Sequence, residues 1–180
     1  KMYSVMLHKF GFGGANLAGT YYDEPNRRML MNIRAGYAKE GEALAMENKK
    51  DSALKILNLC DSMILGQNFP YGYTAPGNMH NVSSLQTVYA YYVAGDSAKA
   101  KSISDEITRD CEQQLAYYSA LPADKLTGDL QDDQQRAQMI IQQLQSWQQL
   151  FIHSSKVPEL PQSFDSTMPV GKDSSNLKAR

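Results

Sequence analysis

One pattern, a short polar joint followed by apolar residues at helical spacing, occurs twice in the chain at an offset of 47 residues. The matching positions are Ala53 and Ala100, Ile56 and Ile103, and Cys60 and Ile107. Steps of three and four residues place these side chains on one face of an α-helix. Joints as short as residues 48–52 and 95–99 connect antiparallel neighbours. The pattern therefore predicts two helix-turn-helix pairs, with alanine where the two helices of a pair approach most closely.

Apolar periodicity predicts the four helices of these pairs at about residues 24–47, 51–64, 81–94 and 97–121. The first begins at Asp23-Glu24-Pro25, because proline suits the first helical turn and acidic side chains suit the positive end of the helix dipole. Gly95 suits the end of the third helix, and Asp96 or Ser97 suits the cap of the fourth. A fifth helix is expected from Asp129 to about residue 153, with a glutamine-rich outer face.

These helices are expected to form a single domain over residues 1–153. Residues 1–24 are rich in glycine and contain several aromatic residues, so we expect an irregular segment that lies against the helices. Residues 154–180 keep no helical period and contain Pro158, Pro161 and Pro169 among serine, aspartate and lysine. This composition predicts an extended tail.

The order of elements predicts an all-α fold of the tetratricopeptide kind, with two antiparallel helix pairs and a C-terminal capping helix. A tetratricopeptide unit has about 34 residues, so the longer offset requires an insertion between the pairs. The Pro/Gly-rich loop at residues 66–80 supplies it. The alternative is a plain bundle of four or five helices in which the repeat is accidental.

Charge and hydropathy argue against two classes of partner. The formal net charge is -1, and the chain lacks the basic surface that nucleic-acid-binding proteins use. Its apolar stretches are far shorter than the roughly 20 residues that cross a bilayer. The chain does not open with a basic region followed by an apolar stretch, so no signal peptide is expected.

No cluster of residues predicts a metal site, a cofactor or a catalytic centre. The histidines His8, His80 and His153 lack the i, i+4 spacing of a helical zinc site. Cys60 and Cys111 lie in predicted helices and are interpreted as buried apolar residues, while a disulfide between neighbouring helices stays open. Because no nucleophile, base and orienting group can be assembled from these positions, the chain is not expected to be an enzyme.

A first group of candidate binding residues lies at the start of the first predicted helix. Arg27, Arg28, Asn32 and Arg34 concentrate hydrogen-bond donors there, and the first helices of tetratricopeptide pairs line the inner groove of the superhelix. These side chains suit a ligand or an acidic partner. The alternative is a structural role, in which they anchor the Gly-rich N-terminal segment.

A second group lies in the loop between the two pairs. Tyr71 and Tyr73, with Phe69, offer aromatic faces that stack on a sugar or a peptide at small entropic cost. Packing of the loop onto its own domain is the alternative.

Four short motifs occur in a recognisable order along residues 9–120. The run KFGFGGANLAGTYYDEPNRRM at residues 9–29 is followed by KDSA at 50–53, FPY at 69–71 and AYYVAGD at 90–96. In this order they resemble the soluble C-terminal region of a family of large bacterial multipass membrane proteins of uncharacterised function. The membrane portion of that family looks like that of protein O-mannosyltransferases and other lipid-sugar-dependent glycosyltransferases.

The resemblance implies a tetratricopeptide-like module on the periplasmic face of the bacterial cytoplasmic membrane. Such a module would be tethered through an upstream transmembrane region and would serve a membrane-embedded, glycosyltransferase-like enzyme that this chain lacks. Its expected function is non-catalytic binding of a polypeptide, a glycan or a partner subunit. A purely structural capping domain that stabilises the larger membrane protein is the alternative.

Overall fold

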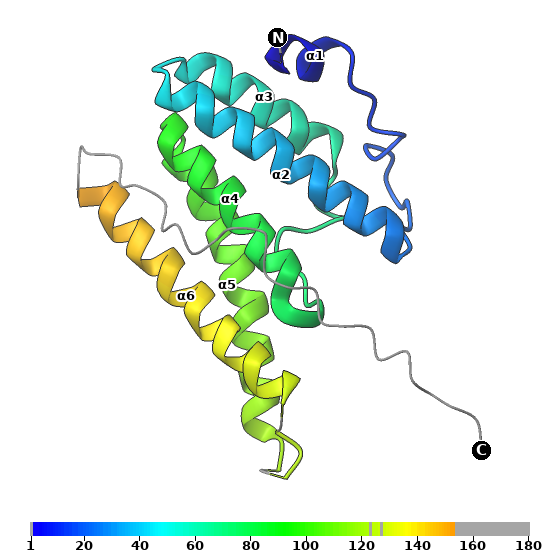
Figure 1. The fold of residues 1–180 in the computed structure, drawn as a ribbon, viewed down its shortest axis with the longest axis vertical. Helices are drawn as coiled ribbons and strands as arrows, with labels where there is room; N and C mark the ends of the chain where they lie inside the picture. The colour runs from blue at the N-terminus through cyan, green and yellow to red at the C-terminus, as the bar shows by residue number, and fades with distance from the viewer. Residues whose placement is uncertain (1, 123, 127, 154–180) are drawn as a thin grey trace.

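The computed structural model describes residues 2–122, 124–126 and 128–153, and within them the fold is all-α, as predicted. The helices are α1 (Met2–His8), α2 (Glu24–Met46), α3 (Lys50–Met63), α4 (Met79–Ala94), α5 (Ser97–Ala120) and α6 (Asp129–His153), with a short 3-10 helix at Pro76–Asn78 before α4 (Figure 1). The described part of the chain contains no β-strand. None of its helices combines the length and apolar character of a membrane span.

Local capping interactions set the helix boundaries. The carboxylate of Asp23 accepts the backbone N–H of Asn26 at 3.1 Å, which begins α2 at the predicted Asp-Glu-Pro motif. At the joint between α4 and α5, Gly95 takes a left-handed conformation with φ of 97° and ends α4. The Asp96 carboxylate then accepts the backbone N–H of Lys99 at 2.9 Å and begins α5. The predicted polar joint is therefore confirmed in its capping chemistry.

The helices are arranged as two pairs that meet through their first members. Helix α2 packs against α3 and α4, α4 packs against α5, and α6 packs against both α4 and α5. Figure 1 shows α3 behind α2 and α5 behind α4, with α6 alongside α4. Ala53 and Ala100 are fully buried at the beginnings of α3 and α5, as the small-residue positions predicted. The order of contacts agrees with two helix pairs and a C-terminal capping helix, while kinship to tetratricopeptide repeats stays a prediction.

The hydrophobic core is centred on α4, which contacts every other long helix. Val88, Tyr89 and Tyr91 are completely buried. The hydroxyl of Tyr91 donates to the side-chain oxygen of Asn58 on α3 at 3.1 Å, and Tyr89 lies 5.4 Å from the ring of Trp147 on α6. Helix α4 is buried on most of its surface. The buried backbone and side-chain polar groups of residues 64–78, which lead into α4, therefore need hydrogen-bond partners within the protein.

The expectation for residues 1–24 requires a correction, because Met2–His8 forms helix α1 rather than irregular structure. Seven residues are too short for a stable isolated helix, so tertiary contacts hold α1 in place. The hydroxyl of Tyr37 on α2 donates to the carbonyl of Met6 at 2.7 Å, and Leu7 packs against the core. Residues 9–23 are irregular as expected. The predicted extended tail at 154–180 lies outside the described residues.

Candidate functional site

Arg34, predicted as a ligand-binding residue, instead holds the loop between α3 and α4 (residues 64–78, the α3–α4 loop). Its side chain is buried and donates to the carbonyls of Phe69 at 2.5 Å, Pro70 at 3.1 Å and Ile64 at 3.4 Å. The guanidinium also stacks on the ring of Tyr71, with its carbon 4.0 Å from the ring centroid. Because these contacts use the planar fork of the side chain internally, Arg34 is not presented to a ligand.

Tyr71 is likewise directed into the protein. Its ring is 4% exposed, and its hydroxyl donates to the carboxylate of Asp61 at 3.0 Å. Lys99 binds the other oxygen of Asp61 at 2.6 Å. The backbone N–H of Tyr71 donates to the carboxylate of Glu106 on α5 at 2.7 Å. Burial raises the pKa of Tyr71 well above its ordinary value, so the hydroxyl stays protonated and serves as a structural donor.

The structure brings two more predicted residues, Arg27 and Tyr73, together at the surface. The Arg27 guanidinium donates to the Tyr73 hydroxyl and lies over the Tyr73 ring, 4.7 Å from its centroid. Arg27 also donates to the carbonyl of Tyr22 at 3.0 Å. Both side chains are half-buried, and together they join the N-terminal segment to the α3–α4 loop. This is the anchoring role that the sequence left open as an alternative.

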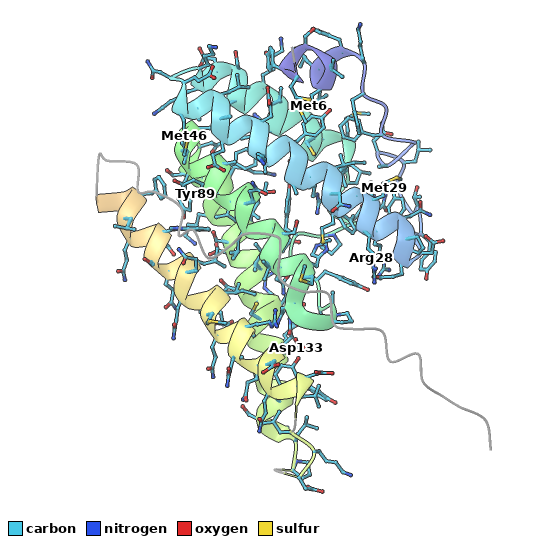
Figure 2. The ribbon with its side chains drawn as sticks, in the orientation of Figure 1. Met6, Arg28, Met29, Met46, Tyr89 and Asp133 are labelled. Atoms are coloured by element: carbon cyan, nitrogen blue, oxygen red, sulfur yellow. The ribbon has the colours of Figure 1, made fainter. Side chains whose placement is uncertain are left out.

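The remaining predicted residues, Arg28 and Asn32, are exposed on α2. Arg28 pairs with Glu24 one turn earlier at 3.0 Å, with both side chains largely in solvent. Figure 2 places Arg28 beside Met29 on the N-terminal half of α2. The six predicted residues therefore do not form one site. Arg34 contacts Tyr71 and Arg27 contacts Tyr73 within the chain, while the other two lie exposed on α2.

A polar network that the sequence did not reveal joins the α3–α4 loop to α4 and α5. Asn78 is fully buried in a left-handed conformation, and its side-chain amide exchanges hydrogen bonds with Gln114 at 2.9 and 3.0 Å. Asn81 donates to Asn78 at 3.0 Å and to the carboxylate of Asp110 at 2.7 Å. The Thr74 hydroxyl donates to the same carboxylate at 3.0 Å. An asparagine before a helix tolerates positive φ, but the partners on α5 are distant in sequence and give no local signal.

His80 has its imidazole packed between the rings of Phe69 and Tyr73, at centroid distances of 4.8 and 5.4 Å. Its Nε2 lies 2.9 Å from the carbonyl of Pro70, which requires the proton on that nitrogen. Burial lowers the pKa of His80 to about 4, so the ring is neutral near pH 7. The imidazole thus fastens the loop.

Cys60 and Cys111 are both free and buried, so the disulfide left open by the sequence is not formed. Burial raises the pKa of each thiol to about 12, which leaves them protonated and unreactive. Within residues 2–122, 124–126 and 128–153, no group of three or more histidine, cysteine or acidic side chains is placed to hold a metal ion.

An open cleft lies where the α3–α4 loop, the second half of α5 and the first turns of α6 meet. Its volume is about 500 Å³, and we call it the α5–α6 cleft. It is lined by Thr74, Ala75, Pro76, Gln113, Gln114, Tyr117, Tyr118, Leu130 and Asp133. Tyr117 is 59% exposed, whereas the neighbouring Tyr118 is buried. Partial burial raises the pKa of Asp133, against the opposing effects of Arg136 and the Gly77 backbone N–H.

A second hollow, of about 460 Å³, lies on α5 between Ala98 and Arg109. Three of its four charged side chains are engaged within the protein, since Lys101 binds Asp105 at 2.6 Å and Glu106 accepts the N–H of Tyr71, and the lining, which also includes Arg109, contains no aromatic ring. The α5–α6 cleft has an exposed aromatic ring and is therefore the better candidate for a binding site.

Comparison of the chain with protein-family models, with curated proteins and with solved structures gives no match. The membrane-protein family suggested by the sequence motifs accordingly stays a prediction.

Proposed function

We propose that this chain is a non-catalytic interaction module that holds a polypeptide, a glycan or a partner subunit for a larger membrane-bound, glycosyltransferase-like protein. The observation that carries the binding role is the α5–α6 cleft, which opens at the junction of three segments of a well-packed helical frame. Its volume lies within the roughly 300–1,000 Å³ of pockets that take small ligands or side chains. The exposed Tyr117 ring supplies contact area with few rotatable bonds to immobilise.

The chemistry of the cleft favours binding over catalysis. Its exposed polar groups are the Thr74 hydroxyl, which donates to Asp110, the Gln113 amide and the Tyr117 hydroxyl, beside the half-buried carboxylate of Asp133. Gln114 is already committed to Asn78 and Asp110. These groups do not make up a nucleophile with an adjacent base and an orienting partner. They are suited to hydrogen bonding, stacking and charge pairing with a ligand.

The periplasmic, membrane-tethered context is proposed from the motif order alone. In the structure, those motifs contain residues that hold the frame together: Arg27 reaches the α3–α4 loop, the FPY segment is bound by Arg34, and Asp96 caps α5. A protein that shares these motifs would need the same contacts. This correspondence supports the proposal of a common fold with the resembling family.

Binding to immobilised peptides and glycans by the purified 180-residue chain tests the interaction role. We expect specific capture of at least one probe class, with loss of capture for Tyr117→Ala. Tyr21→Ala is the matched control, because Tyr21 is 82% exposed on the N-terminal segment, outside the cleft. An absence of specific capture from peptide arrays, glycan arrays and bacterial membrane extracts would count against an interaction module.

A purely structural capping domain is the second candidate, and the internal roles of four predicted binding residues favour it. Arg27, Arg34, Tyr71 and Tyr73 all contribute to holding the chain's own loop. This function predicts that Tyr71→Ala lowers stability and that no surface variant, Tyr117→Ala included, alters binding of any partner. The response of capture to Tyr117→Ala therefore separates the two functions.

A further inference from the structure

The end of the molecule that carries the α5–α6 cleft is rich in acidic residues. Between residues 110 and 133 the sequence has one basic residue, Lys125, against the acidic residues Asp110, Glu112, Asp124, Asp129, Asp132 and Asp133. Figure 2 shows Asp133 on the lower part of α6, well away from Arg28 on α2. Since the whole chain has a net charge of -1, this acidic character is local. It favours a ligand of opposite charge.

The cleft also has a suitable geometry for a long cationic side chain. Tyr117 stands against Tyr118, with ring centroids 5.7 Å apart and an interplanar angle of 62°. The buried ring thus contacts the exposed one at a steep angle, and Tyr117 still keeps more than half of its surface exposed. Pro76 and the half-buried Leu130 give the same cleft an apolar wall.

Some carboxylates near the cleft already accept hydrogen bonds within the protein, so fewer groups are available to a ligand. Asp110 accepts hydrogen bonds from Asn81, Gln114 and Thr74. The Asp133 carboxylate accepts a hydrogen bond from the Gly77 backbone N–H and has Arg136 one turn further along α6, and its half-buried side chain lines the cleft. The groups available to a ligand are consequently the Tyr117 ring, the Asp133 carboxylate and the Gln113 amide.

We infer that the α5–α6 cleft binds a lysine or arginine side chain of a polypeptide segment, an assignment that rests on the interaction role proposed above. The cation lies between the face of Tyr117 and the carboxylate of Asp133, where both the ring quadrupole and the negative charge attract it. Its aliphatic stem packs on Leu130 and Pro76, and the exposed Gln113 amide bonds the peptide backbone. A neutral glycan would stack on Tyr117 and donate hydroxyl hydrogen bonds to the carboxylate, but it would gain no attraction between opposite charges.

Fluorescence anisotropy with three labelled peptides of 12 residues tests the assignment, using the whole 180-residue chain. The peptides contain four repeats of Gly-Ser-Lys, Gly-Ser-Glu or Gly-Ser-Gln, and a panel of neutral and acidic oligosaccharides is titrated in parallel. We expect the lysine peptide to bind at least about tenfold more tightly than the other two at low ionic strength, with affinity falling as salt screens the charges.

Matched substitutions locate the binding. Asp133→Asn and Tyr117→Ala are each expected to lower the affinity for the lysine peptide by about threefold to tenfold. Asp51→Asn makes the same charge change at an exposed position of α3, and Tyr21→Ala removes an exposed ring elsewhere; both should stay within about twofold of the unmodified chain. Gln113→Lys places a positive charge on an exposed wall of the cleft and should weaken binding of the lysine peptide, because the new ammonium group repels the peptide's cation. Because Gln113 is exposed, this variant tests the site without disturbing the core.

Three results would overturn the assignment in distinguishable ways. Equal weakening by Asp133→Asn and Asp51→Asn would show diffuse attraction to an acidic surface. Preferential binding of the glutamate peptide or an oligosaccharide would make the ligand class wrong while leaving the interaction module standing. Binding of none of the probes, in chains that circular dichroism shows to be folded, would contradict both proposals.

Discussion

Replacement of Arg34 by leucine tests whether this side chain stabilises the fold rather than binding a ligand. Arg34 donates hydrogen bonds to three backbone carbonyls of the α3–α4 loop and stacks on Tyr71. Leucine fills part of the space but leaves those carbonyls without their donor inside the protein. Each hydrogen bond from a charged donor is worth about 1.5–3 kcal/mol, and the desolvation of a buried guanidinium offsets much of the sum. We expect a net loss of about 2–4 kcal/mol in the free energy of unfolding.

Urea denaturation followed by circular dichroism at 222 nm measures this loss directly. In thermal unfolding it corresponds to a decrease in Tm of roughly 5–15 °C for a chain of this size. Arg34→Lys keeps the charge but loses the fork and the stacking, so it should recover only part of the stability. Hydrogen exchange should show faster exchange of the Tyr71 and Gly72 amides, because the loop that presents them to Glu106 is no longer held.

Arg28→Leu is the matched control, since it removes a guanidinium that is exposed and paired only with Glu24. Exposed pairs of this kind contribute less than about 0.5 kcal/mol. If Arg34→Leu were no more destabilising than Arg28→Leu, the buried guanidinium would not be holding the loop. The candidate ligand-binding role of Arg34 would then return.

Three further predictions concern the same loop and the helix joint. A Cβ on Gly72 would lie 2.5 Å from the backbone carbonyl of Glu106, so Gly72→Ala should cost about 1–3 kcal/mol, measured by urea denaturation against Gly66→Ala, which meets nothing within 4 Å. The unfolded state binds a proton on His80 more readily than the folded state, because burial lowers the pKa of His80 in the fold. The free energy of unfolding should therefore be unaffected by this group above about pH 6.5. It should fall by up to about 3 kcal/mol as the pH drops to about 4, and a smaller fall is expected in His80→Gln. Ala100→Leu should overpack the α4–α5 joint and cost about 1–3 kcal/mol, and unchanged thermal stability would contradict close helix approach there.

The helical architecture could be predicted because its signals are local in sequence. The start of α2 at Asp23-Glu24-Pro25 and the joint at Gly95 and Asp96 follow from capping chemistry that involves residues within one turn of each other. For α6, the local signal was the helical spacing of its apolar residues, which predicted a helix from Asp129. Helix α1 carried no such signal, because its seven residues depend on contacts with α2.

The candidate site could be predicted only in part, because the same residue types serve internal and external contacts. Arg34 and Arg28 lie six positions apart on one helix, yet burial makes the first a loop anchor and leaves the second in solvent. Tyr71 resembled a stacking platform in the sequence but faces Asp61 inside the protein. The apolar spacing along α5 places Tyr118 rather than Tyr117 on the buried face, but no local signal showed that the exposed Tyr117 ring would line the α5–α6 cleft.

The sequence by itself determined about where helices α2 to α6 begin and end, which face of each is apolar, and that small residues lie at the helix joints. These properties depend on dihedral preferences, caps and spacing within a few residues. Only the tertiary structure decided which arginines and tyrosines remain available to a partner, because that depends on whether another segment, 10 to 46 positions away in these contacts, supplies carbonyls, carboxylates or rings to satisfy them. A polar group in contact with water keeps its capacity to bind, whereas one that is buried must use it within the fold.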